Sequence, residues 1–445
     1  MSRIAAVLLL AATAHAGVPL QERPDANAVF AVRADVTIEG TVRTHAGQGQ
    51  EQSMPLKAQA VFQFDEKHLD EAAVDPAARR MLRVYSAASA STSVGDFQTT
   101  TALPSALRRV VIAGRAEGPV KFSLDGLMTR EAVDLLDMPG DPLSLAAAMP
   151  AEADASFAVP EHAAQMLCGM DVLTKSTLAG RVQQSAGGTQ VTLSGNVEGA
   201  RLGAPVKTGV SGTVSVDPAG RIMAANLTYD EKAEIGTITP GLDSRTTVRL
   251  TRRPVDKTLD ATGVPTAVPP TALKLYLDAP SWGIRVLHER DWHVFYANTE
   301  GNPAVVILRL LDDGKLLSQV NLAKLKPAAA GQSATPEQFE ADIRRSLGTR
   351  FGAIVERSQE TREDDVKLTR VVASGEFHYE ETVSGETLRK SRPMEWTYYL
   401  IAHPDGRQMS AVFAHEPSER TALTGRDLEL ISALEFFPPQ VASKP

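Results

Sequence analysis

The stretch Val29-Phe-Ala-Val-Arg-Ala-Asp-Val-Thr-Ile38 alternates apolar and polar side chains. Successive side chains of an extended chain point to opposite faces, so this alternation predicts a half-buried antiparallel strand. The same pattern returns in residues 56–64, 191–197 and 210–216. The turn sequence Asp217-Pro-Ala-Gly220 then predicts a returning strand over residues 222–229. Many strands in series indicate one curved antiparallel sheet.

Two short helices are predicted to interrupt this sheet. Residues 129–136 begin with Thr129, a capping residue, carry an acidic residue in the first turn, and stop before Pro139-Gly140. Residues 160–167 begin with Pro160, which we place at the first helical position. We expect both helices to cover the concave face of the sheet.

The first sixteen residues have the layout of a secretory signal peptide. Arg3 supplies a positive charge, residues 4–14 form an apolar run, and Ala14-His-Ala16 is a small-x-small cleavage site before Gly17. The run is shorter than the roughly 20 apolar residues of a permanent transmembrane helix. We therefore expect export to the periplasm or the cell exterior. An uncleaved anchor and an N-terminal core helix are the alternatives.

The expected curved sheet and its compartment together resemble the LolA-like lipoprotein-carrier half-barrels of the bacterial envelope. The resemblance rests on architecture, without a diagnostic motif, and it implies a sheet with an apolar concavity. Whether the sheet encloses a cavity is left open by the residues themselves. No stretch after the signal reaches about 18 consecutive apolar residues, so no transmembrane segment is expected in the mature chain.

A proline-rich segment divides the chain. Prolines 254, 265, 269 and 270 lie within residues 254–271, and proline at this density favours an extended linker. All three Trp and five of the seven Tyr follow it. We therefore predict a β-rich domain over residues 17–253, a linker over 254–271 and an α+β domain over 272–445.

The second domain is predicted to contain a hairpin over residues 273–287, a strand over 305–311, a meander and a closing helix. Its clearest helix begins at Thr335, with Pro336 in the first turn and Gln338 completing a capping box. An apolar stripe follows on one face of that helix, made of Phe339, Ile343 and Leu347. The meander is predicted over residues 366–383, 394–401 and 408–414. The closing helix, residues 427–434, is predicted to bury Leu428, Ile431 and Leu434.

This order is similar to that of the PsbP-like family. The similar segments are Tyr276 to Leu287, Asp291-Trp-His293, the helix from Thr335 to Leu347, Trp396-Thr-Tyr-Tyr-Leu400, Met409-Ser-Ala-Val-Phe413 and Leu430-Ile-Ser-Ala-Leu-Glu-Phe436. The resemblance implies an α/β/α sandwich with one central antiparallel sheet, in a family of binding or assembly factors. The whole chain is therefore expected to be α+β. No functional residue is carried over from the family.

Composition excludes some partners and some chemistry. The formal net charge of −8 and the absence of a basic cluster argue against nucleic acid and against an anionic membrane surface. Cys168 is the single cysteine, so no intramolecular disulfide is expected, and its apolar surroundings favour a buried small hydrophobe over a nucleophile. The three Trp, with Tyr398 and Tyr399, are candidates for carbohydrate binding, although core packing is the preferred interpretation.

Catalytic and cofactor motifs are missing from the sequence. Neither G-x-S-x-G, S-x-x-K nor a phosphate-binding G-x-x-x-x-G-K-[ST] occurs. His288 and His293 are five residues apart and would not share a helix face. His403 and His415 flank one predicted hairpin, with His378 a strand away, and the sequence leaves open whether any of these five histidines binds metal. We predict no catalytic residue, no metal and no cofactor.

These observations favour an exported, non-enzymatic binding or assembly protein of the cell envelope, for an apolar ligand such as a lipid or for a protein partner. The alternatives are a hydrolase with an unsignalled site and a structural surface protein. An interior lined by Ala, Val, Leu and Met would favour the first class. A cleft with a His and a carboxylate in hydrogen-bond reach would favour the second, and a solid core under a flat polar surface the third.

Overall fold

The computed structural model describes residues 18–22, 25, 28–45, 51–70, 79–115, 118–153, 155–185, 188–312, 314–383 and 386–438. The predicted signal peptide lies outside these residues, as does Gly17. In the described part the protein is mostly β with few helices, so the expected α+β class is correct in part. Within that part, no helix has both the length and the apolar character needed to span a membrane.

The first half of the chain forms one large antiparallel sheet, which has thirteen strands in the described residues; eleven of them follow the order β10-β12-β13-β14-β15-β16-β2-β3-β4-β6-β7. The strands are β2 (Val29–His45), β3 (Glu51–His68), β4 (Arg80–Val94), β6 (Arg109–Ala113), β7 (Val120–Ser123), β10 (Ser156–Ala158), β12 (Ala179–Ser185), β13 (Gly188–Arg201), β14 (Ala204–Val216), β15 (Ile222–Ala233) and β16 (Gly241–Val255). Off this path, β5 (Phe97–Ala102) pairs with β4 and β11 (Val172–Ser176) with β13. A separate pair joins β1 (Val18–Pro19) to β9 (Glu152–Ala153). The predicted alternating strands are confirmed, each inside a longer strand.

Three short helices lie against one face of this sheet: α1 (Arg130–Leu135), α2 (Pro142–Ala148) and α3 (Glu161–Cys168). Thr129 caps α1 as predicted, by accepting a hydrogen bond from the Ala132 backbone. Pro160 is the residue before α3 and not its first helical residue, which corrects the predicted start. The helix α2 was not predicted; all seven of its residues are buried, so it has no amphipathic stripe to reveal it.

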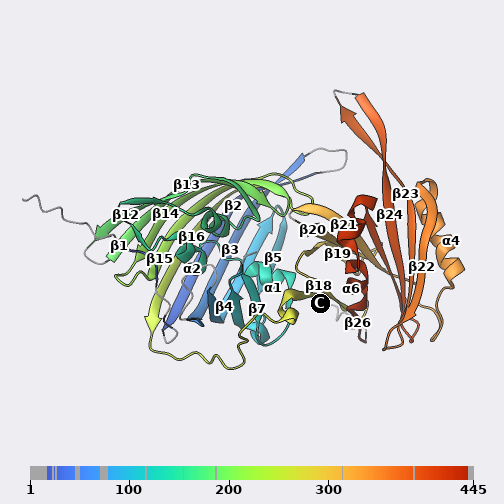
Figure 1. Ribbon diagram of the computed structural model, residues 1–445, viewed down its shortest axis with the longest axis horizontal. Coiled ribbons are helices and arrows are strands. Elements are labelled where there is room, and N and C mark those ends of the chain that lie inside the picture. Colours follow the sequence, from blue (N-terminus) through green and yellow to red (C-terminus); the bar gives the residue numbers. More distant parts are fainter. Residues whose placement is uncertain are drawn as a thin grey trace, which may run out of the picture.

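The sheet curls around the segment that leads into α2 (Figure 1). Gly140 has a positive φ of 66°, and a Cβ at this position would lie 3.0 Å from the Leu227 side chain on β15. The next residue, Asp141, accepts hydrogen bonds from Arg83 on β4. In the sheet, β4 is four strands away from β15. Adjacent strands are about 4.8 Å apart. One pair of neighbouring residues therefore bridges strands that would be about 19 Å apart in a flat sheet.

The opposite face of the same sheet is covered by the proline-rich segment. Strand β16 continues to Val255, and Pro254 is paired with Phe30 of β2, so the predicted linker begins inside the sheet. Beyond it, Leu259 packs with Val111 and Phe122 on the outer face. The short 3-10 helix η4 (Pro270–Leu273) then leads into the second half. The segment therefore packs on the sheet and does not extend away from it.

The two halves of the chain share a small sheet with the order β26-β18-β17-β8. Its strands are β8 (Met128–Thr129), β17 (Lys274–Ala279), β18 (Ile284–Glu289) and β26 (Leu434–Phe436). The hairpin β17–β18 is the predicted one, whereas β8 comes from the first half and pairs with β17 in parallel. Arg290 adds two hydrogen bonds across the junction, to the carbonyls of Lys121 (2.7 Å) and Ala272 (2.9 Å).

The second half is built on a seven-stranded antiparallel sheet with the order β19-β20-β21-β25-β24-β23-β22, counted over the described residues. Its strands are β19 (Trp292–Asn298), β20 (Val305–Asp312), β21 (Lys315–Lys324), β22 (Phe351–Thr361), β23 (Lys367–Val383), β24 (Glu386–Ala402) and β25 (Gln408–His415). The predicted meander is confirmed as β23, β24 and β25. All three Trp side chains are buried, as the core interpretation requires.

Helices lie on both faces of this sheet (Figure 1). On one face, α4 (Pro336–Leu347) packs through Phe339, Ile343 and Leu347, and its complete capping box confirms the prediction. The other face carries α5 (Arg420–Leu423), α6 (Arg426–Ser432) and also the small shared sheet, so that layer is not purely helical as a simple α/β/α sandwich requires. Ile431 and Leu434 are buried as predicted, although Leu434 belongs to β26 and not to the helix, whereas Leu428 is 38% exposed.

Candidate functional site

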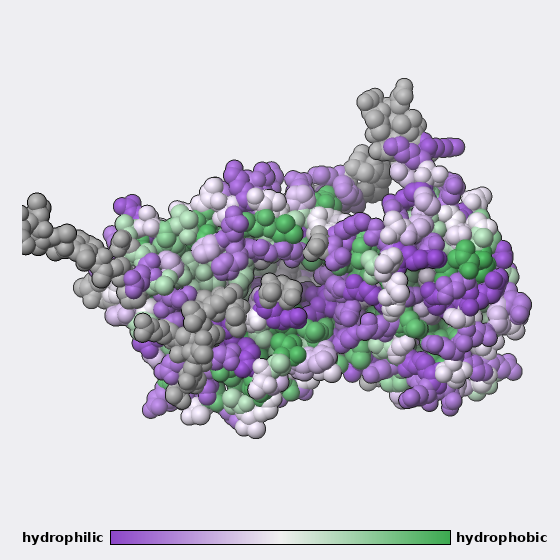
Figure 2. Space-filling model, in the orientation of Figure 1, coloured by the Kyte–Doolittle hydropathy of each residue, from purple (hydrophilic) through white to green (hydrophobic). Residues whose placement is uncertain are grey.

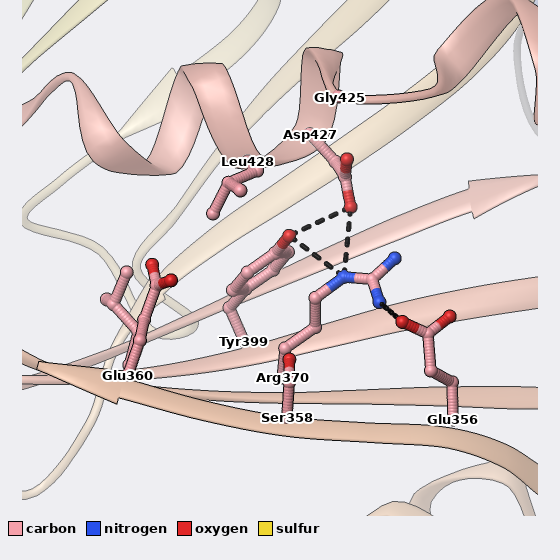
Figure 3. Close-up of a pocket in the computed structure, with 9 residues that line it drawn as sticks. Glu356, Ser358, Glu360, Arg370, Tyr399, Gly425, Asp427 and Leu428 are labelled. Atoms are coloured by element: carbon pink, nitrogen blue, oxygen red, sulfur yellow. Dashed lines mark hydrogen bonds and ion pairs between the residues drawn. The ribbon is translucent and has the colours of Figure 1, made fainter.

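A polar pocket of about 270 Å³ lies between the edge strand β22, its neighbours β23 and β24, and the start of α6 (Figure 3). Glu356, Ser358 and Glu360 alternate along β22 and line it, as the pleat of a strand requires. The lining residues are Glu356, Ser358, Glu360, Leu368, Arg370, Tyr399, Gly425, Asp427 and Leu428. The exposed Leu428, which the sequence placed in the core, forms part of this wall.

The centre of the pocket is a hydrogen-bonded group of three side chains (Figure 3). The Tyr399 hydroxyl donates to Asp427 Oδ2 at 2.8 Å, and Arg370 Nε lies 3.0 Å from that hydroxyl and 3.3 Å from the same carboxylate oxygen. Arg370 Nη1 donates to Glu356 Oε1 at 2.5 Å. Burial, followed by the charge of Asp427, raises the pKa of Tyr399 far above its ordinary value, so the phenol stays protonated.

Among the residues that the structure describes, this pocket does not contain the pair of a histidine and a carboxylate that would favour the hydrolase alternative. Its lining, within the described residues, contains neither His nor Cys. The one cation, Arg370, is already neutralised by two carboxylates. What the arrangement offers a ligand is a set of fixed hydrogen-bonding groups.

The histidines singled out in the sequence are spread over the second half. His288 is buried on β18, with Nδ1 2.8 Å from the Glu289 carbonyl, and His293 lies on β19. Burial, with a further contribution from the positive charge of Arg130, lowers the pKa of both rings to about 4. Both are therefore neutral at neutral pH.

The three other histidines do not converge. His403 Nδ1 lies 2.9 Å from Asp405, while His415 Nε2 lies 3.3 Å from Glu395. His378 is paired with Ser391, four residues or about 13 Å along β24 from Glu395. Across the described residues, no group of three or more potential ligands could hold a metal ion.

His415 and Glu395 form a second His–carboxylate pair, in addition to that of His403 and Asp405. Both side chains are buried, and Glu395 also accepts a hydrogen bond from Arg420 at 2.9 Å. Burial lowers the pKa of His415 despite the neighbouring carboxylate. The pair forms an ion network with the half-exposed Arg420 and does not line the pocket described above.

The remaining candidates lie in the core. Burial raises the pKa of the Cys168 thiol to about 12, so it is a buried thiol and no thiolate nucleophile, as predicted. Tyr398 and Tyr399 are buried with the three Trp. None of these five aromatic side chains is an exposed platform for a sugar ring.

A continuous chain of buried charges, which was not predicted from the sequence, lies between helix α2 and the large sheet. It links Asp141 at the start of α2 through Arg83, Glu66 and Arg252 to Glu22. Arg83 donates to Asp141 twice, at 2.5 and 2.8 Å, and to Glu66 at 2.8 Å. Arg252 lies 3.2 Å from Glu66 and donates to Glu22 at 2.7 Å.

Aromatic rings flank the buried chain of charges, and a histidine lies at its Glu22 end. The guanidinium of Arg83 lies 4.6 Å from the centre of the Phe64 ring, and that of Arg252 lies 3.6 Å from the centre of the Phe30 ring. His68 Nε2 lies 3.6 Å from Glu22. Charges at this depth are tolerated only when they are paired and hydrogen-bonded. The cluster therefore fixes helix α2, the N-terminal segment and three strands relative to one another.

A signal for this cluster was present in the strand pattern. Glu66 and His68 continue the inward-facing register of the apolar positions 62 and 64 on β3, and Arg252 follows 248 and 250 on β16. Charged residues on the inner side of an otherwise apolar alternation indicate buried ion pairs. Their partners could not be identified, because Arg83 and Asp141 are 58 residues apart and Glu22 and Arg252 are 230 apart.

The buried chain of charges predicts that the protein loses stability in acid. Burial alone would raise the pKa of Glu22, but His68 and Arg252 outweigh it and lower the pKa from 4.5 to about 2. A lowered carboxyl pKa contributes stability above pH 4.5 that is lost as the pH falls towards 2. We expect the free energy of unfolding to fall by about 3 kcal/mol over this range from this residue.

Urea denaturation between pH 6 and pH 2 tests this expectation. Glu22→Gln should be less stable than the wild type at pH 6 and should lose less stability on acidification. Glu39→Gln, at an exposed position of β2, is the control and should keep the wild-type dependence. An unchanged acid dependence in Glu22→Gln would contradict the assignment.

Comparisons with known proteins assign no family. No family model and no curated protein matches the chain. A solved structure concerning lipid–protein interactions in lipovitellin is similar over 53% of this chain and 26% of its own, with 8% identity and a TM-score of 0.33. A loop-deletion variant of OmpT, an outer membrane protein of Vibrio cholerae, is matched over 88% of this chain and 99% of its own, with 9% identity and a TM-score of 0.12.

These similarities are too low to carry an argument. The chain spans about a quarter of the lipovitellin chain that it matches. The resemblances to LolA-like and PsbP-like proteins stay predictions from sequence.

Proposed function

We propose that this chain is an exported, non-enzymatic binding protein of the cell envelope, and that its large sheet holds an apolar ligand, such as an acyl chain, against helices α1–α3. Export is supported by the signal-peptide layout of residues 1–16. The observation that carries the binding proposal is the composition of the helical segment, residues 128–170. It holds five of the eleven methionines of the chain, and α2 and α3 add alanines and leucines.

Helices of this composition suit a displaceable cover. Methionine side chains are unbranched and adapt to irregular shapes, which is why they are common at surfaces that bind varied apolar ligands. Helices of six to eight residues are not stable alone and depend on packing. Moving α2 and α3 away from the sheet would expose an apolar lining without unfolding any of the long strands. That lining includes Val32, Val36, Phe62, Val210 and Leu227.

The surface supports an internal site over an external one. In Figure 2 the hydrophobic residues of the visible face form small spots between hydrophilic ones. The exposed large apolar residues of the described chain are Phe97, Val172, Phe295, Tyr296, Leu316, Val355, Tyr379 and Leu428. Scattered exposed apolar residues are normal for a globular surface, whereas an apolar docking site forms one continuous patch. An apolar ligand is therefore better accommodated between the sheet and its helices.

Photo-crosslinking with an alkyl chain locates the site directly. The full-length exported protein is incubated with a long-chain alcohol that carries a diazirine, irradiated and mapped by peptide mass spectrometry. We expect labels within residues 128–170 and on the inner positions of β2, β3 and β14. Native mass spectrometry of the protein from its own host should show a stoichiometric apolar molecule that solvent extraction removes.

A matched comparison is available within the same chain. The core beneath α4 is also apolar, and its residues Phe339, Ile343 and Trp396 should remain unlabelled. Equal labelling of both cores would indicate non-specific partitioning and would contradict the proposal. So would a protein that neither carries an apolar mass nor takes up the probe.

A further inference from the structure

Arg83 presents a two-pronged hydrogen-bond donor at the point where α2 meets the sheet. Its Nη1 and Nη2 donate in parallel to the two oxygens of Asp141, and its Nε is held by Glu66. The side chain of Arg83 is completely buried. A planar guanidinium with two donors fixed in this way is the arrangement that proteins use to recognise a carboxylate.

Asp141 belongs to the helix and not to the sheet. Its carboxylate caps α2 by accepting a hydrogen bond from the Leu143 backbone at 2.9 Å, and its own carbonyl accepts from the Ser144 hydroxyl at 2.8 Å. The carboxylate therefore leaves Arg83 whenever α2 leaves the sheet. Without Asp141, Arg83 and Arg252 retain Glu66 and Glu22 as partners: Arg83 Nη1 loses its carboxylate, while Nη2 still lies 2.8 Å from Glu66 Oε2.

The surroundings of Arg83 combine a polar end with an apolar path. The Phe64 ring lies beneath the guanidinium and packs against Tyr85 at 4.9 Å between ring centres. Beyond these rings, the inner face of β2 and β3 is apolar at Ala34, Val36 and Phe62. A molecule with a carboxylate at one end and an alkyl chain behind it would match both parts.

We propose that Arg83 is the head-group site for a long-chain carboxylic acid, and that Asp141 occupies the same two donors when α2 is seated. This inference rests on the proposed function and specifies its ligand class. The ligand carboxylate takes over both hydrogen bonds as the helix moves out, and its alkyl chain takes the place of the α2 side chains. The exchange replaces one carboxylate with another, so the buried cations remain paired throughout.

The test compares two probes of equal chain length in the full-length protein. Palmitic acid carries the carboxylate, and hexadecanol does not; both are titrated at neutral pH by displacement of a fluorescent alkyl probe. In the wild type, we expect palmitic acid to bind at least ten-fold more tightly. This factor corresponds to about 1.4 kcal/mol, within the range of a hydrogen bond to a charged group.

Asp141→Asn removes the competing charge but keeps a good capping side chain. We expect this variant to bind palmitic acid about ten-fold more tightly than the wild type, with less than a two-fold change for hexadecanol. The matched control is Asp70→Asn, which removes the charge from another bidentate pair, that of Asp70 with Arg80 at the start of β4. It should change neither affinity.

The outcomes separate the two proposals. Equal binding of both probes by the wild type overturns the head-group site and leaves the apolar site standing. An equal gain for both probes in Asp141→Asn also overturns it, because α2 would then be a cover without a head-group contact. Failure of both probes to bind wild type and variant overturns the proposed function itself.

Discussion

Replacing Arg83 with methionine is expected to lower the free energy of unfolding by about 3–5 kcal/mol. The substitution keeps most of the apolar stem of the side chain but removes the cation that Glu66 and Asp141 share, so that Glu66 retains only Arg252. Unpaired buried carboxylates are costly because the interior cannot solvate them. Urea denaturation of the full-length protein, followed by circular dichroism, measures the change.

The control for this prediction lies on the same strand. Arg80 makes a bidentate pair with Asp70, but both side chains are partly exposed. Because water screens exposed pairs, Arg80→Met should cost no more than about 1 kcal/mol. Equal losses in Arg83→Met and Arg80→Met would mean that the chain of charges is not buried in solution.

A triple replacement distinguishes the cost of an unpaired buried charge from the cost of lost packing. Breaking one partner of a buried ion pair is expensive, whereas replacing all partners with apolar residues of similar size is often neutral. Arg83→Met combined with Glu66→Leu and Asp141→Asn should therefore recover most of the stability lost in the single variant. If the triple variant is no more stable than Arg83→Met, the loss comes from packing and not from charge.

Local patterns predicted the strands because the apolar–polar alternation of a strand can be read from consecutive residues. The pairing that closes the large sheet is different: β16 lies beside β2, with Val248 opposite Val36. No local feature specifies this register, because more than two hundred residues separate the two positions. The sequence therefore indicated an antiparallel sheet but not which strand lies at its centre.

The errors in the helices have specific physical causes. Helix α2 is apolar on all sides because the curled sheet surrounds it, and periodicity identifies only helices with one buried face. In α6, the same periodicity predicted that Leu428 is buried, but this side chain is exposed beside β22. The sheet ends at β22, so Leu428 in the first turn of α6 has fewer neighbours to pack against than Ile431 has.

The candidate site could be predicted even less well than the fold. Inward-facing charges on β3 and β16 pointed to buried ion pairs, but their partners come from distant segments. The pocket beside α6 depends on Tyr399, Arg370 and Asp427, which approach one another only after the meander and the closing helix have packed. Neither group has a sequence motif, because no fixed spacing joins its members.

Phe339→Ala is expected to lower the free energy of unfolding by about 3–5 kcal/mol, through lost burial and the cavity that remains. Phe339 packs with Ile343 and Leu347 of α4 against Val371 and Trp396 on the sheet. Calorimetry and urea denaturation of the full-length protein measure the effect, which should appear without a change in probe binding by the first half.

Two substitutions in the same helix calibrate this value. Thr335→Ala should cost about 1 kcal/mol, because it removes the hydroxyl that accepts from the Gln338 backbone at 3.3 Å. Arg345→Ala should stay within about 0.5 kcal/mol, because the Arg345 side chain is 79% exposed. Arg344 is the poorer control, since its guanidinium lies 4.5 Å from the centre of the Phe351 ring. If Arg345→Ala proved as damaging as Phe339→Ala, α4 would have to present its charged face to the sheet, and the buried stripe assigned from both sequence and structure would be wrong.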